Sequence, residues 1–112
     1  MGNGGHDTLS NLEYHVLLAL AGGALYGYAL KEAVVEESGG ALTPRAGSLY
    51  RVLARMMSRG YVEEVDRQRD EPHPGLERRY YDLRPRGRQA LEVETGRLRS
   101  ATALAEQRLG LA

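Results

Sequence analysis

Glycine and proline divide this chain into short segments, and their positions constrain the fold more than any other feature. The pairs Gly22-Gly23 and Gly39-Gly40 each end a helical segment, because glycine is the preferred residue just past a helix. Gly60 ends a third segment, and Pro85 suits the first position of a fourth. The sequence therefore predicts four helices with these approximate bounds: Ser10 to Gly22, Leu25 to Glu37, Pro44 to Gly60, and Pro85 to Leu109.

Two of the helix starts carry recognisable caps. Ser10, with Glu13 three residues later, has the spacing of a capping box. Thr43 can cap the third helix, with Pro44 at its first helical position. These residues predict well-defined starts for the first and third helices.

Two short strands are expected after the third helix, at Val62 to Val65 and at Tyr80 to Leu83. A loop rich in charge, proline and glycine joins them. Three helices and a charged hairpin are the layout of a winged helix-turn-helix, a mainly α fold with a small β-hairpin that fits duplex DNA. We assign residues 8–84 to this DNA-binding domain, residues 85–112 to a C-terminal dimerisation helix, and residues 1–7 to a disordered tail.

The third helix is amphipathic. On a wheel of about 100° per residue, one side gathers its large apolar residues, which are Leu49, Val52, Leu53 and Met56. The opposite side carries small residues with Tyr50 and Arg51, flanked by Ser48 and Arg55. Such a face can enter a major groove, where arginine reaches phosphates or guanine edges and tyrosine can bind a phosphate. A plain amphipathic helix with solvated arginines is the alternative.

The formal net charge is zero, but the charges are unevenly distributed. Residues 42–88 carry eleven basic and seven acidic side chains, whereas residues 1–41 carry one basic and five acidic. The positive excess therefore falls on the third helix and the hairpin, where a local basic face suits DNA. A solvated loop is the alternative for the hairpin, whose arginines we expect along the DNA backbone: Arg67, Arg69, Arg78 and Arg79.

Composition argues against several other classes of protein. The chain has no cysteine, which excludes disulfides and thiolate zinc sites and favours the cytoplasm. No apolar run approaches the roughly 20 residues of a membrane span, and the N-terminus has no signal-peptide pattern. The three histidines are scattered, and no acid pair or Gly-rich phosphate loop is recognisable. We therefore expect no catalytic residue, no metal and no cofactor.

Tyrosines flank Gly27 near the start of the second helix. Since Gly27 has no side chain, another backbone can approach closely there. We expect one of Tyr26 and Tyr28 to face the core and the other the surface; a phosphate contact from Tyr28 is the sharper alternative. One of Tyr80 and Tyr81 is expected in the core for the same reason, because strand residues alternate faces.

The last helix is longer than the remaining core of such a domain can cover. Leu91, Leu98 and Ala105 keep a heptad spacing, although Glu94 and Arg108 interrupt the companion positions. We therefore expect a homodimer; a helix folded back on its own domain is the alternative. The expected interface residues, two of them from the first helix, are Leu12, Val16, Leu91, Leu98, Ala101, Leu104 and Ala105.

Four blocks, taken in order, resemble the PadR family of transcriptional regulators. They are Leu25-Tyr26-Gly27-Tyr28, Gly47-Ser48-Leu49-Tyr50-Arg51, Arg78-Arg79-Tyr80-Tyr81, and Gly87 with Leu91. The resemblance implies a homodimer, in most members a repressor, and often one that responds to a small molecule. Two positions depart from the pattern: Arg45-Ala46 replaces a common Ser-Pro, and Arg84-Pro85 stands where a capping Thr is frequent.

The resulting hypothesis is a repressor that binds duplex DNA with the third helix in the major groove and the wing on the backbone. A winged-helix module that binds a protein partner instead of DNA is the alternative. An effector, if one binds, is expected beside Tyr14 and His15, because the chain has no Trp or Phe and no aromatic residue follows Tyr81. The expected DNA contacts are Tyr28, Arg45, Gly47, Ser48, Tyr50, Arg51, Arg55, Arg67, Arg69, Arg78 and Arg79.

Overall fold

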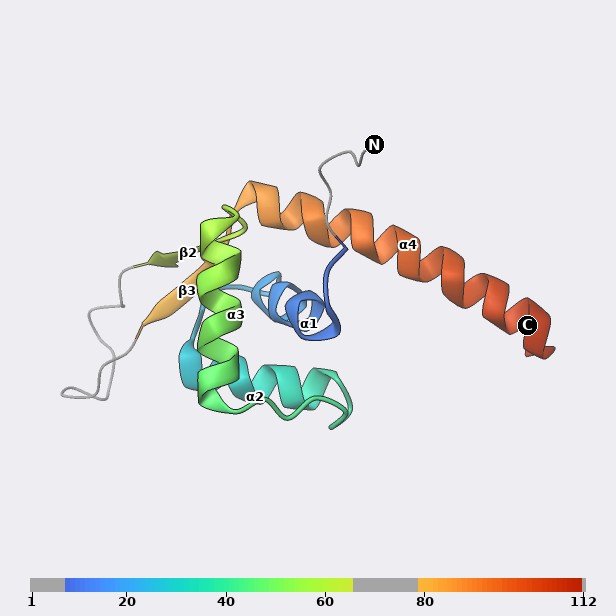
Figure 1. Ribbon diagram of the computed structural model, residues 1–112, viewed down its shortest axis with the longest axis horizontal. Helices are drawn as coiled ribbons and strands as arrows, with labels where there is room; N and C mark the ends of the chain where they lie inside the picture. The colour runs from blue at the N-terminus through green and yellow to red at the C-terminus, as the bar shows by residue number, and fades with distance from the viewer. Residues whose placement is uncertain (1–7, 66–78, 112) are drawn as a thin grey trace.

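The computed structural model describes residues 8–65 and 79–111, which form a winged helix-turn-helix with a long C-terminal helix (Figure 1). The elements are α1 (Asn11–Leu20), β1 (Leu25–Tyr26), α2 (Gly27–Glu37), α3 (Ala46–Ser58), β2 (Val62–Val65), β3 (Tyr80–Leu83) and α4 (Pro85–Leu109). In Figure 1, α1 occupies the centre of the domain, and α4 extends away from it. The expected fold class is confirmed, whereas the predicted tail at residues 1–7 lies outside the described residues.

Helix α1 begins at the predicted capping box. The Ser10 hydroxyl oxygen accepts a hydrogen bond from the Glu13 N–H at 3.1 Å, and Glu13 Oε1 accepts one from the Ser10 N–H at 2.9 Å. The helix then buries Val16, Leu17 and Leu20 completely or almost completely. The core around it draws on every other helix and on the sheet, through Leu30, Val34, Leu49, Leu53, Met56, Val62, Tyr81 and Leu91, among others.

The sheet has three antiparallel strands in the order β1-β3-β2. Strands β2 and β3 have the predicted bounds, and Val62 pairs with Leu83 and Val65 with Tyr80. Strand β1 was not predicted: Leu25 and Tyr26 were assigned to the second helix, but they pair with the β3 tyrosines, so α2 begins at Gly27. Pairing with a distant strand overrode the local helical pattern. Tyr81 is buried, as expected for one of the two β3 tyrosines.

Helix α3 begins later than predicted. Its N-cap is Arg45 with extended backbone angles, and the first helical residue is Ala46, so Thr43 is not the cap and Pro44 is not the first helical residue. Proline disfavours a helical conformation at the residue before it, which keeps Thr43 out of the helix. The predicted stop is confirmed, because Gly60 adopts φ +79° and the N–H groups of Gly60 and Tyr61 bond to carbonyls of the last turn.

Helix α4 has the predicted bounds, with Pro85 in its first turn. Its beginning packs so tightly on the domain that a Cβ at Gly87 would overlap the Tyr61 carbonyl. Its 25 residues correspond to a rod of about 37 Å at 1.5 Å per residue, and every residue from Arg97 to Leu111 is exposed. Within the described residues, no helix combines the length and apolar character needed to cross a membrane.

Candidate nucleic-acid interface

The two faces of α3 separate as the sequence predicts. Its four large apolar residues are buried in the core, while the opposite face is exposed to solvent. That exposed face is built mainly from small residues with one tyrosine and two arginines, namely Gly47, Tyr50, Arg51, Ala54, Arg55 and Ser58. The packing of α3 therefore leaves a shallow polar surface uncovered.

Tyr50 lies across the start of α2. A Cβ built on Gly27 would stand 2.8 Å from the Tyr50 hydroxyl oxygen, so the absence of a side chain at Gly27 makes room for the phenol. The sequence analysis expects a backbone to approach Gly27, and this expectation is wrong in its partner, because the group that lies close to Gly27 is the Tyr50 side chain. Half of the Tyr50 side chain remains exposed, beside the unpaired N–H groups that open any helix.

Tyr28 projects from the first turn of α2, and 62% of it is exposed, whereas Tyr26 is half-buried and its ring stacks at 5.6 Å from that of Tyr80. Tyr28 is thus the surface tyrosine, as expected, whereas Tyr26 packs on Tyr80 and does not enter the core. The negative charge of Glu32, whose carboxylate accepts a hydrogen bond from the Tyr28 hydroxyl, raises the pKa of Tyr28.

Arg51 extends from the exposed face of α3. Its guanidinium lies 3.4 Å from the Ser48 hydroxyl oxygen, a long contact within the same turn. Among the described residues it has no carboxylate partner. Arg45, the N-cap residue, is exposed at the same end of the helix. The two arginines provide positive charge at the N-terminal half of α3.

Arg55, also a predicted DNA contact, is held by α1. Its Nε donates to Glu13 Oε2 at 2.8 Å, and Glu13 is only 5% exposed. Burial alone would raise the pKa of Glu13, but the Ser10 N–H and the guanidinium of Arg55 together lower it, so the carboxylate is ionised at neutral pH. In the sequence Glu13 is recognisable only as part of a helix cap, because nothing in a single sequence indicates a pair 42 residues apart.

The wing is described only in part. Arg79 is exposed immediately before β3 and makes contacts of its own, while Arg67, Arg69 and Arg78 lie outside the described residues. Next to the wing, Arg84 forms an exposed ion pair with Glu63 at 3.0 Å.

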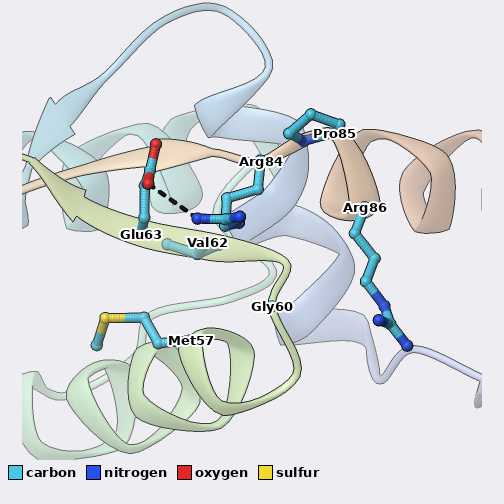
Figure 2. A pocket seen from close by; sticks show the side chains of 7 residues that line it. All are labelled: Met57, Gly60, Val62, Glu63, Arg84, Pro85 and Arg86. Carbon is cyan, nitrogen blue, oxygen red and sulfur yellow. Dashed lines mark hydrogen bonds and ion pairs between the residues drawn. The ribbon is translucent and has the colours of Figure 1, made fainter.

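A groove opens at the other end of α3, with a volume of about 580 Å³ (Figure 2). The Glu63–Arg84 ion pair lies along it, and the Arg86 side chain extends away toward solvent. Because it adjoins Met57 and Gly60, the groove is separated from Tyr50 and Arg51 by about two helical turns. It is therefore not part of the surface predicted from the sequence, and its lining residues are Met57, Gly60, Val62, Glu63, Arg84, Pro85 and Arg86.

The predicted dimer residues fall into two groups. Val16 and Leu91 are buried in the protomer core and offer no surface to a partner, which corrects their assignment; Leu12 is half-buried. The first turns of α4 pack against the core of the domain, so the apolar face of α4 is exposed only beyond these turns. The exposed group is Leu98, Ala101, Leu104 and Ala105. Leu18 and Val93, which are not among the predicted interface residues, are exposed as well.

The two residues proposed for an effector lie together at the start of α1. The Tyr14 and His15 rings meet edge to face at 5.7 Å. The Tyr14 hydroxyl oxygen lies 2.8 Å from the Thr95 hydroxyl oxygen of α4, and His15 Nδ1 lies 2.9 Å from the Asn11 carbonyl oxygen. Tyr14 is therefore already engaged within the protomer.

Comparison with known proteins identifies a family that this chain matches. A model of the transcriptional regulator PadR-like family matches residues 16–93. A curated protein, described as an uncharacterized 37.1 kDa protein in transposon Tn4556 of Streptomyces fradiae, is 43% identical over 82 residues. That match covers 70% of this chain but 20% of the relative, so the chain spans about a fifth of that protein's length.

Solved structures share the fold. A PadR family transcription regulator from Clostridium difficile has a TM-score of 0.73 at 22% identity, covering 89% of this chain and 99% of that one. Bacillus subtilis PadR, solved in complex with operator DNA, has a TM-score of 0.63 at 25% identity, covering 74% of this chain and 46% of that one. A PadR-like regulator from Bacillus cereus has a TM-score of 0.72 at 22% identity, covering 88% and 90%.

Proposed function

The chain belongs to the PadR-like family of transcriptional regulators, and on that basis we propose that it represses transcription by binding duplex DNA as a homodimer. The observation that carries the proposal is the exposed face of α3, which is small, polar and positively charged at its N-terminal half. The operator DNA in the Bacillus subtilis PadR structure supports the choice of ligand. Such a regulator acts in the cytoplasm, on the nucleoid.

In the proposed complex, α3 enters the major groove. Arg51 reads a base edge, since it is exposed one turn into the helix and a guanidinium can pair with guanine in bidentate fashion. The Tyr50 hydroxyl, which lies against Gly27, meets a phosphate at the N-terminus of α2, where N–H groups and the helix dipole favour an anion. Tyr28 lies beside that position, and Arg79 contacts the backbone from the wing.

The homodimer is proposed to form through α4. The apolar face that is buried at Leu91 continues outward as Leu98 and Ala105. Leu98 is 42% exposed and is not among the residues that form the protomer core or pack against it. A second copy of the helix would cover it, and the small Ala101 and Ala105 would let two helices approach closely. Two α3 helices would then meet successive major grooves, about 34–36 Å apart.

We also propose that any effector binds beside Tyr14 and His15, against α4 of the partner protomer. His15 and the edge of the Tyr14 ring are the aromatic groups nearest the exposed Leu18 along α1. Calorimetry with planar aromatic compounds on the parent protein and on Tyr14→Ala tests this placement. Binding that survives that substitution unchanged would place the effector elsewhere.

The function is tested by selecting duplexes from a random library with the purified protein. Anisotropy titrations then compare the selected duplex with a scrambled one, and sedimentation gives the stoichiometry. We expect a preference of about 10³-fold or more for the selected sequence, which is the low end for specific regulators, and two protomers per duplex. A reporter fused to a promoter that carries the selected site should lose expression when the protein is present. Equal binding to both duplexes would refute the proposal.

A further inference from the structure

The first turn of α1 touches both of the helices on which the proposed function depends. Glu13 reaches α3, where its Oε2 accepts the hydrogen bond from Arg55 Nε at 2.8 Å. Its other oxygen, Oε1, accepts a hydrogen bond from the Ser10 N–H at 2.9 Å, so both carboxylate oxygens are held in place. The next residue, Tyr14, reaches α4 through the hydroxyl pair with Thr95 at 2.8 Å. Adjacent residues of one helix thus hold the proposed reading helix and the proposed dimer helix.

These contacts differ in kind from the packing around them. The apolar core that joins α1, α3 and α4 is held by the hydrophobic effect, which is non-directional. A hydrogen bond between charged groups is short and directional, and fixes both distance and orientation. Glu13 is almost fully buried, and α1 lies between α3 and α4 (Figure 1). The first turn of α1 is therefore built to hold the two helices at one separation.

We infer that Glu13 and Tyr14 are positioning residues that set the placement of α3 relative to α4, and so select operators by the separation of their half-sites. The inference rests on the proposed function, because it requires a dimer joined through α4 and reading DNA through α3. It assigns Arg55 to this arrangement through Glu13, not to direct reading of bases. One inserted base pair moves the second half-site by about 3.4 Å and turns it by roughly 35°, which only a rigid frame would detect.

A competing explanation makes the opposite prediction. If Glu13 merely neutralised an arginine that contacts phosphate, Glu13→Gln would release a positive charge and tighten binding to every duplex. If Glu13 positions α3, the same substitution loosens the frame and weakens binding most on the preferred spacing. The sign of the change on the selected duplex therefore separates the two.

The experiment uses the full chain and the duplex that the parent protein selects from a random library. Derivatives of that duplex have one base pair added to or removed from the centre, between the half-sites. Glu13→Gln and Tyr14→Phe are compared with the control Glu94→Gln, which alters a carboxylate of similar burial, 7% exposed, whose ion pair with Arg97 at 3.6 Å stays within α4. Each affinity is corrected for the active fraction by stoichiometric titration, so partial unfolding cancels in the ratio between spacings.

We expect the parent to bind its own spacing about tenfold or more tightly than the altered spacings. Glu13→Gln should lose most of that preference, because a tenfold ratio is within the contribution of one charged hydrogen bond. Tyr14→Phe, which removes one hydroxyl and preserves the ring, should lose about half of it on a logarithmic scale, and Glu94→Gln should retain it. Equal weakening of binding on every spacing, or tighter binding on every spacing, would overturn the inference. If Glu13→Gln were too unstable to measure, the same outcomes for Tyr14→Phe alone would overturn it. A parent that selects no duplex would instead refute the proposed function.

Discussion

Helices α3 and α4 each leave one face uncovered, and the two faces differ in chemistry. The exposed face of α3 carries Tyr50 and Arg51 among small residues, whereas the outer half of α4 exposes Leu98 and Leu104. Burial alone does not distinguish them, since both helices are amphipathic and both contribute to the same core. The difference indicates two kinds of partner. A polar face with arginine suits a phosphate backbone and base edges, and an apolar face suits another apolar face.

The two halves of α4 extend this comparison within a single helix. The face that begins at Gly87 and Leu91 is buried against the domain, and continues at Leu98 and Ala105 beyond its edge. The residue types along this face change little, whereas the burial of the face changes from covered by the domain to exposed. The apolar face of α4 continues beyond the domain that buries its beginning, and this exposed continuation is what supports the proposed dimer through α4.

The largest effect is expected from a charge on the outer half of α4. Leu98→Glu places a carboxylate in the proposed seam once per protomer, at a cost of about 3–5 kcal/mol, which raises the dimer dissociation constant by roughly a thousandfold. The fold should survive, since the site is exposed in the protomer. Sedimentation gives the oligomeric state and circular dichroism the helicity.

Ala103→Glu is the matched control for that substitution. Ala103 is also exposed but lies about 140° around the helix from Leu98 and about 100° from Leu104, so its charge should leave the dimer intact. A stable dimer for Leu98→Glu, or equal dissociation in both variants, would contradict the proposed seam and with it the contrast between the faces of α3 and α4.

Two glycines compare the packed beginning of α4 with its midpoint. Gly87→Ala would drive a Cβ into the Tyr61 carbonyl, where backbone must move, and should cost about 3 kcal/mol of unfolding free energy. Gly96→Ala meets nothing within 4 Å and should gain about 0.5–1 kcal/mol from helix propensity. Chemical denaturation measures both, and a similar change in the two variants would show that the inner half is not clamped to the domain.

How far the sequence predicted this fold depends on whether a signal was local. The bounds of β2, β3 and α4 follow from glycine, proline and alternating residues, and the structure confirms them. Strand β1 has two residues and exists because it pairs with β3, more than fifty positions away. No local pattern marks such a strand, so its residues were assigned to α2.

The features of the candidate site also divide into those with a local signal in the sequence and those without one. The exposed face of α3 follows from helical periodicity, so Tyr50 and Arg51 were found on the surface as expected. The contacts that anchor this face were not foreseen, because Glu13 with Arg55 and Tyr50 with Gly27 join separate helices. Helical periodicity identifies a face, whereas the partners of its residues depend on how the helices pack.

Arg51 tests whether the α3 face reads sequence. Arg51→Ala should cost about 1–3 kcal/mol on the selected duplex and relax base preference at one position in each half-site. Arg79→Ala, on the wing, should weaken all duplexes about equally and make the slope of log affinity against log salt shallower by roughly 0.9. Titrations at several salt concentrations on selected and scrambled duplexes measure both. If Arg51→Ala weakened the two duplexes equally, Arg51 would be a phosphate contact and the α3 face would position without reading.

The smallest expected effect concerns the Tyr50 hydroxyl and sharpens the contrast between polar and apolar faces. Tyr50→Phe removes only the oxygen that lies against Gly27. It should cost about 1.5 kcal/mol of binding free energy on any duplex, the low end for a hydrogen bond to a charged group, if that oxygen donates to a phosphate. Gly27→Ala displaces the same hydroxyl oxygen by adding a methyl group on α2. Its Cβ would stand 2.8 Å from the hydroxyl oxygen, which lies at the movable end of a side chain, so the phenol should swing away with little loss of stability.

The two substitutions should therefore weaken DNA binding by similar amounts, and the double variant should be no weaker than either single one, because the shared hydroxyl can be lost only once. Anisotropy titrations on one duplex, with denaturation curves for all four proteins, complete the cycle. Additive losses would mean that Gly27 contributes to DNA binding independently of Tyr50, through its own backbone N–H at the start of α2. Unchanged affinity in both variants would remove Tyr50 from the DNA surface and leave its ring a packing role between α2 and α3.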